Sequence, residues 1–125
     1  MNISSRHAEN AAAMRFLDGG QCHSDIAELL YIHARRLAGV DVITAHGRKP
    51  FPAIGLAHEG NYFAVATGMQ HVTLRLPTDH AELLVSYGAF ANEAFGTSNW
   101  ISFAPFSLRI DMDVWIEVAF ENSSL

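Results

Sequence analysis

The sequence predicts an α+β fold, a mostly antiparallel sheet of about five strands with helices packed on it. Apolar residues recur with the helical period of about 3.6 before residue 39 and with the strand period of 2 from residue 42. Glycine turns join the strand candidates too tightly for parallel pairing, which needs a crossover of about a dozen residues. The expected order is helix, helix, a run of four strands, helix, strand and helix.

Two helices are predicted before the first strand. Residues 5–17 are rich in alanine and end at Asp18, where glycines follow. The apolar face of this helix is modest, so we expect it to pack on a neighbouring surface rather than in the main core. That face consists of Ala13, Met14 and Leu17. The second helix begins near Ser24 or Asp25, with Asp25 and Glu28 spaced as a capping box, and ends at Gly39.

Short strands with hairpin turns follow. Residues 71–76 alternate apolar and polar side chains, which is the pattern of a half-buried strand. Gly60 and Gly68 can supply the positive φ that tight turns need. The strands are predicted over residues 42–46, 53–58, 61–67, 71–76 and 99–104.

Two further helices flank the last of these strands. Thr78 or Asp79 begins a helix that runs to Tyr87, and residues 89–98 are predicted to be an apolar loop. Asp111 caps the final helix, residues 112–120. One side of that helix faces the core with Met112, Trp115, Ile116, Ala119 and Phe120.

Length and composition favour one domain over residues 1–125, with residues 1–20 as a helical extension. A chain that is 50% hydrophobic is not disordered, and a net charge of −5 argues against nucleic-acid binding. Cys22 is the single cysteine, so we expect no disulfide and a cytoplasmic location. Apolar stretches are too short for a signal peptide or a membrane span, so no membrane association is expected.

Several short segments between residues 25 and 120 occur in a characteristic order. They are Leu37-Ala38-Gly39-Val40, Asn61-Tyr62-Phe63-Ala64, Leu74-Arg75-Leu76-Pro77, Phe95-Gly96, Asn99-Trp100 and Trp115-Ile116 through Ala119. In these segments the chain resembles the N-terminal domain of the TfoX (Sxy) competence regulators and their stand-alone relatives. The resemblance implies an α+β domain without established catalytic residues, often associated with regulation. A looser likeness is to a luciferase-like domain of unknown function.

The first predicted hairpin departs from that family. The family has a Met-Phe-Gly-Gly-like turn there, whereas residues 45–52 of this chain are longer and basic. A function of the family's turn therefore does not transfer to this chain.

Seven histidines require a metal site to be considered. His46, His58, His71 and His80 fall on neighbouring strands and turns, but no His-x-x-x-His or Cys-x-x-Cys pair is present. We therefore predict no metal and no cofactor. The sequence has neither a Gly-x-Ser-x-Gly elbow nor a pair of carboxylates unexplained by helix capping, so no catalytic residue is predicted. Enzymatic activity is left open, with a non-enzyme favoured.

Two functions remain open. The favoured one is a non-enzymatic interaction or regulatory module. Its simplest partner is a second copy of the chain in a homodimer, and a different protein is the other partner considered. It follows because residues 99–104 are apolar on both faces and the helices do not suffice to cover both. The alternative is a binding protein or minor enzyme for an anionic or aromatic small molecule, with a pocket between sheet and helices. Its candidate ligand-binding residues are His46, Arg48, Lys49, His58 and Trp100.

Overall fold

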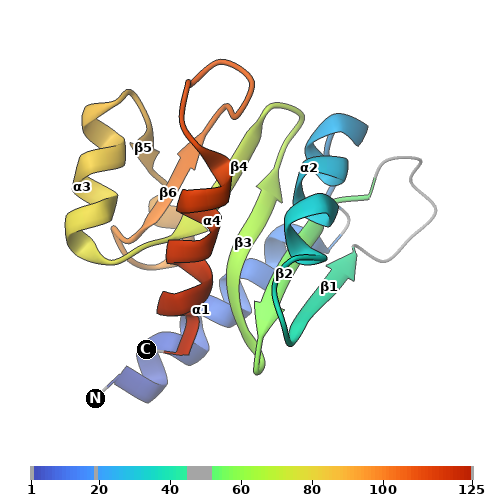
Figure 1. Ribbon diagram of the computed structural model, residues 1–125. Helices are drawn as coiled ribbons and strands as arrows, with labels where there is room; N and C mark the ends of the chain where they lie inside the picture. The colour runs from blue at the N-terminus through green and yellow to red at the C-terminus, as the bar shows by residue number, and fades with distance from the viewer. Residues whose placement is uncertain (1, 19, 45–51, 125) are drawn as a thin grey trace.

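The computed structural model describes residues 2–18, 20–44 and 52–124 (Figure 1). Within these ranges the helices are α1 (Asn2–Leu17), α2 (Ser24–Ala34), α3 (Thr78–Ser86), α4 (Met112–Glu121) and the short 3-10 helices η1 (Glu93–Phe95) and η2 (Asn122–Ser124). The strands are β1 (Val40–Thr44), β2 (Ile54–His58), β3 (Asn61–Thr67), β4 (His71–Arg75), β5 (Phe90–Ala91) and β6 (Trp100–Phe103). They form an antiparallel sheet in the order β1-β2-β3-β4-β6-β5, so the predicted α+β class is confirmed.

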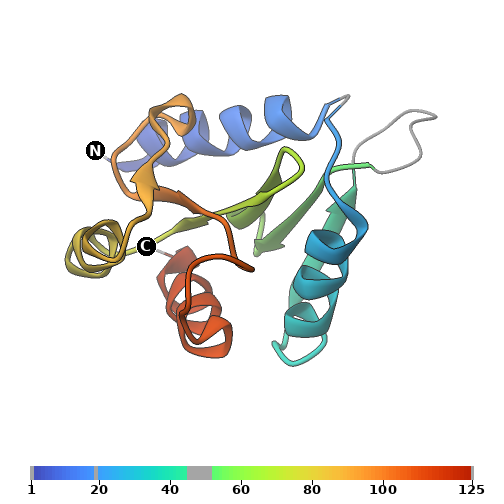
Figure 2. The ribbon, with the colours of Figure 1, turned by 90° about the horizontal axis from the view of Figure 1, so that it is seen from above.

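Helices cover both faces of the sheet (Figure 2). α1 lies on one face with η1 beside it, and α2, α3 and α4 lie on the opposite side. Each side has its own apolar cluster, because strand side chains point to both faces of a sheet. The α1 side buries Ala12, Ala13, Leu17, Ala53, Ala57, Tyr62, Val65, Phe95 and Trp100. The larger cluster on the other side includes Ile26, Leu30, Leu56, Phe63, Leu74, Leu84, Trp115 and Ile116.

The position of α1 corrects two expectations. We expected this helix to pack on a neighbouring surface rather than in the core, but Ala12, Ala13 and Leu17 are buried in the smaller of the two clusters. We also expected the helices not to suffice for both faces of residues 99–104, but Trp100, Ile101 and Phe103 of that segment are all buried. Ala13 is fully buried, since a methyl side chain lets a helix approach a sheet closely. Gly55 of β2 makes room for the helix: a Cβ atom there would lie 3.1 Å from Cδ1 of Leu17 and 3.2 Å from Cε1 of Tyr62.

Two differences from the predicted strands are larger than one residue. β1 begins at Val40 rather than at residue 42, directly after Gly39, which has a φ of +77°. The predicted loop 89–98 contains β5, which pairs Phe90 with Ser102 on β6. A strand of two residues is too short to show a period of two in the sequence, so its pairing is visible only in the fold.

Helix caps were predicted in part. Asp111 caps α4 as expected, and its carboxylate accepts a hydrogen bond from the backbone N–H of Asp113 at 3.0 Å. The N-cap of α2 is His23 and not Asp25. Nδ1 of His23 accepts from the backbone N–H of Asp25 at 3.0 Å, so an imidazole takes the place of the expected carboxylate.

A buried histidine joins α2 to α4. His33 is 6% exposed, and its Nδ1 lies 2.9 Å from Oδ1 of Asp113. Nη1 of Arg36 lies 2.6 Å from the same carboxylate oxygen. Burial lowers the pKa of His33 below its ordinary value; Asp113 and Asp111 oppose this shift, and Arg36 adds to it. At neutral pH the imidazole is therefore uncharged and Nδ1–H donates to Asp113.

We expect acid to destabilise the fold through His33. The unfolded chain binds a proton at the ordinary histidine pKa, whereas the folded chain resists it, so the free energy of unfolding falls as the pH drops below about 6.5. Urea unfolding followed by circular dichroism between pH 7.5 and 5.5 measures this fall. His33→Asn keeps a donor to Asp113 but does not titrate, so its stability should depend less on pH. Equal pH dependence in the two proteins would contradict the assignment.

Candidate functional site

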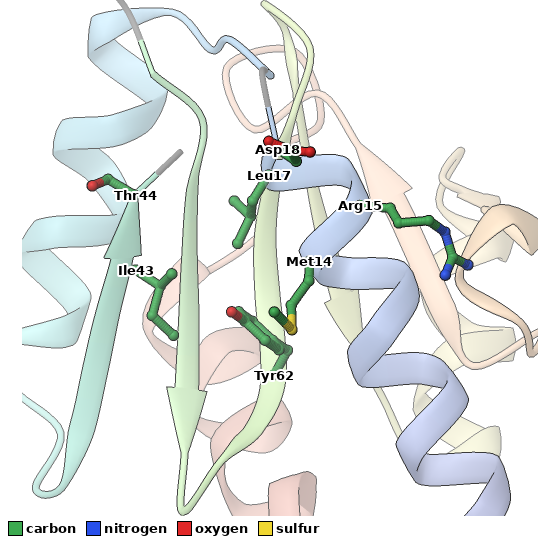
Figure 3. A pocket seen from close by; sticks show the side chains of 7 residues that line it. All are labelled: Met14, Arg15, Leu17, Asp18, Ile43, Thr44 and Tyr62. Atoms are coloured by element: carbon green, nitrogen blue, oxygen red, sulfur yellow. The ribbon is translucent and has the colours of Figure 1, made fainter. Parts of the chain in front are cut away.

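A groove lies between α1 and the β1 edge of the sheet (Figure 3). It has a volume of about 280 Å³. We call it the α1 groove. It is lined by Met14, Arg15, Leu17, Asp18, Ile43, Thr44 and Tyr62.

The groove exists because α1 covers only part of its face of the sheet. The helix packs against β3, β2 and η1, which leaves β1 beside it without a helix on that face (Figure 2). Met14 and Leu17 project from α1 toward this uncovered part, and Ile43 of β1 lies across from them (Figure 3). Met14 is 58% exposed, whereas Leu17 is buried. The walls and floor of the groove are thus mostly apolar.

A β-bulge places Tyr62 in the groove. Ala57 of β2 pairs with Tyr62 and Leu56 pairs with Ala64, so Phe63 is an extra residue on β3. Such a residue reverses the alternation of side chains along the strand, and bulges often redirect a side chain next to a functional site. Val65 and Tyr62 consequently face α1, although they are an odd number of positions apart.

The backbone of Tyr62 is held by α1 on both of its polar groups. Its N–H donates to Oδ1 of Asn10 at 3.0 Å, and its carbonyl accepts from Nη2 of Arg6 at 3.0 Å. Burial raises the pKa of the Tyr62 phenol, so the hydroxyl is protonated at neutral pH. That hydroxyl has no hydrogen-bond partner among the described residues. Its ring points from β3 into the groove, toward Ile43 (Figure 3).

A buried ionic network fixes the helix that forms the groove wall. Oε1 of Glu9 lies 2.7 Å from Nε of Arg75 and 2.7 Å from Nε1 of Trp100. Nη1 of Arg6 is 3.9 Å from the same oxygen. Burial and the neighbouring Arg75 lower the pKa of Arg6 to about 10, and Glu9 opposes the shift. The carboxylate of α1 is therefore bound between guanidinium groups of two elements, which anchors the helix to β4.

The candidate ligand-binding residues from the sequence do not line this groove. His58 lies on the opposite side of the sheet, where its ring packs against Phe120 at 4.6 Å and Nδ1 is 3.0 Å from Oγ of Ser123. Trp100 is fully buried on the α1 side and stacks on Phe95 at 4.6 Å. His46, Arg48 and Lys49 lie outside the described residues. The structure therefore does not bring His58 and Trp100 together.

The groove residues were missed by sequence reasoning for an identifiable reason. Ile43 and Tyr62 were placed on the correct strands, but the covering helix and the bulge that direct them to one face leave no trace in the hydrophobic period. Asp18 was interpreted only as the end of a helix. One signal in the sequence could have indicated the groove. It is Met14, a large apolar residue next to alanines on a helix that is followed by glycines.

Within residues 2–18, 20–44 and 52–124, no group of three or more His, Cys, Asp or Glu side chains is placed to hold a metal ion. None of the helices in these ranges combines the length and apolarity that crossing a membrane requires. No family model matches the chain, and neither does any curated protein or solved structure.

Proposed function

We propose that this chain is a non-enzymatic interaction module that forms a homodimer by pairing β1 with β1 of a second copy. The observation that carries the proposal is the position of β1 at the edge of the sheet, paired with β2 on one side only. An edge strand presents a row of backbone N–H and C=O groups that another strand can pair with. β1 is five residues long, against two for β5 at the other edge.

The side chains of β1 suit pairing with themselves. An antiparallel pair centred on Val42 places Val42 opposite Val42, Asp41 opposite Ile43 and Val40 opposite Thr44. No two like charges stand directly opposite in this register, and β-branched side chains face each other at its centre. A two-fold axis through Val42 generates a closed dimer, which is the commonest oligomer.

Exposed apolar side chains beside β1 would add to the interface. A stable interface buries about 800 Å² on each partner, which one pair of short strands does not provide alone. Val42 is 39% exposed, Met14 of α1 is 58% exposed, and Ile32 of α2 is 38% exposed. Both helices flank the β1 end of the sheet on opposite faces (Figure 2). This apolar area is the further support for the dimer.

A regulatory role in the cytoplasm completes the proposal. It rests on the resemblance to the TfoX N-terminal domain and on Cys22, the single cysteine. Cys22 is buried and burial raises the pKa of its thiol, so the cysteine suits a structural role in a reducing compartment. Strand addition by a different protein at β1 is the other partner that the same edge would accept.

We expect the wild-type protein to be a dimer and Val42→Lys to be a monomer. The substitution places two like charges opposite each other on the two-fold axis, and edge lysines prevent strand pairing. Size-exclusion chromatography with light scattering measures the mass. Val85→Lys is the matched control, since Val85 is 42% exposed on α3, at the other end of the sheet.

Circular dichroism must show that both variants are folded. A wild-type protein that stays monomeric at high concentration would overturn the homodimer, and a Val42→Lys variant that remains dimeric would overturn the β1 interface.

A further inference from the structure

We propose that the α1 groove binds a small aromatic amine, a molecule of one or two rings that carries a protonated amino group. The groove shares β1 and Met14 with the proposed dimer interface, but all of its lining residues belong to one copy of the chain.

The apolar part of the groove would hold the ring. Leu17, Ile43 and the ring of Tyr62 surround it, and Met14 offers a flexible thioether, which packs favourably on aromatic faces (Figure 3). The volume of about 280 Å³ is just below the range of about 300–1,000 Å³ found for small-molecule sites. A ligand of one or two rings is therefore the size that fits.

The hydroxyl of Tyr62 supplies a fixed polar contact. Tyr62 is 6% exposed, and its hydroxyl has no hydrogen-bond partner among the residues that the structure describes. Among the described residues, the fully buried side-chain atoms without a partner are Nε and Nη1 of Arg6, so the Tyr62 hydroxyl is in contact with solvent in the groove. The ammonium group of a ligand can replace that water as its hydrogen-bond partner. The bulge on β3 and the hydrogen bonds from Asn10 and Arg6 hold the phenol in this position.

The charges at one end of the groove favour a cation. Asp18 follows the last residue of α1, and no cation of the described residues pairs with its carboxylate. The C-terminal end of a helix carries a partial negative charge, which adds to that of Asp18. The side chain of Arg15 points away from the groove, toward the opposite side of α1 (Figure 3). An ammonium group is thus attracted to this end.

The main competing hypothesis is that the α1 groove prefers an anionic ligand. Arg48 and Lys49 follow Thr44 closely in the sequence, and an anionic ligand would be expected if they governed the site. Phenethylamine and 3-phenylpropionate are suitable probes, since they have the same ring and nearly the same length but opposite charges.

The test is a titration of isotope-labelled protein with each probe, followed by the backbone amide resonances. Phenethylamine should shift the signals of Leu17, Ile43 and Tyr62 and should bind at least fivefold more tightly than 3-phenylpropionate. Tyr62→Phe, which removes only the hydroxyl, should weaken phenethylamine by about three- to tenfold. Asp18→Asn should weaken phenethylamine and leave 3-phenylpropionate unchanged.

Matched controls separate this proposal from the dimer. Tyr87→Phe, at a tyrosine that is 52% exposed on the surface, should leave the affinity unchanged. Phenethylamine should bind the monomeric Val42→Lys variant, because the groove is formed within one copy and Val42 does not line it. Shifts outside the groove only, equal or tighter binding of 3-phenylpropionate, or full affinity in Tyr62→Phe would each overturn the proposal.

Discussion

Replacing Glu9 with alanine is expected to lower the free energy of unfolding by about 3–5 kcal/mol, because it leaves the guanidinium groups of Arg6 and Arg75 without their shared carboxylate. Glu9 is 2% exposed, so water cannot replace the lost charge. The indole N–H of Trp100 also loses its acceptor. Small domains are stable by about 5–15 kcal/mol in total, so this one carboxylate accounts for a large part of the stability.

Urea unfolding followed by circular dichroism measures the effect. Glu9→Gln should be milder, since an amide oxygen can still accept from Trp100 although it carries no charge. Glu117→Ala is the control, because Glu117 is exposed on α4 and its loss should change the free energy by less than about 0.5 kcal/mol. A loss below about 1 kcal/mol in Glu9→Ala would show that the network does not anchor α1.

The second large effect is expected at Phe63, where alanine should lower the free energy of unfolding by about 3–5 kcal/mol. Phe63 is fully buried at the bulge of β3, and its ring meets that of Phe120 edge to face at 5.7 Å. Removing it opens a cavity between the sheet and α4, which neighbouring side chains cannot fill without moving the helix.

Phe106 offers the same side chain in the opposite environment. It is 67% exposed, so Phe106→Ala should change the free energy of unfolding by no more than about 0.5 kcal/mol. The two variants are compared by the same urea titration. Similar values for both would mean that Phe63 is not part of the packed core.

Much of this fold could be predicted where a segment is long and one of its faces is clearly apolar. β3 was predicted over its full length, and α4 was predicted within one residue together with its cap, Asp111. β3 is an apolar run between turns at Gly60 and Gly68, and α4 has a strong helical period. Both contribute to the larger core cluster, so local pattern and tertiary environment agree.

The position of α1 could not be predicted by the same reasoning. Its contact face is made of alanines such as Ala12 and Ala13, which bury little area each and give no strong apolar stripe. What binds it to the sheet are polar contacts of Arg6, Glu9 and Asn10 with distant partners, and the sequence does not reveal which residues pair across such separations.

The candidate site depended on that same helix. The groove could not be predicted because the position of α1, which forms its wall, was not known. The bulge at Phe63 was not known either, and a regular strand would place Tyr62 and Val65 on opposite faces. The candidates predicted from the sequence included histidines and basic residues, because these residue types commonly bind ligands. The groove is built mainly from apolar side chains, which a sequence does not distinguish from core residues.

The contacts of α1 also set the order in which a nascent chain can mature. Arg6 donates to the carbonyl of Ser123, Glu9 accepts from Trp100, and the first of these contacts spans 117 positions of the chain. α1 therefore leaves the ribosome before its partners and cannot complete its docking until they have emerged. Until Trp100 emerges, the apolar cluster on the α1 side is incomplete and its side chains are open to chaperones, and closure over so long a loop slows folding.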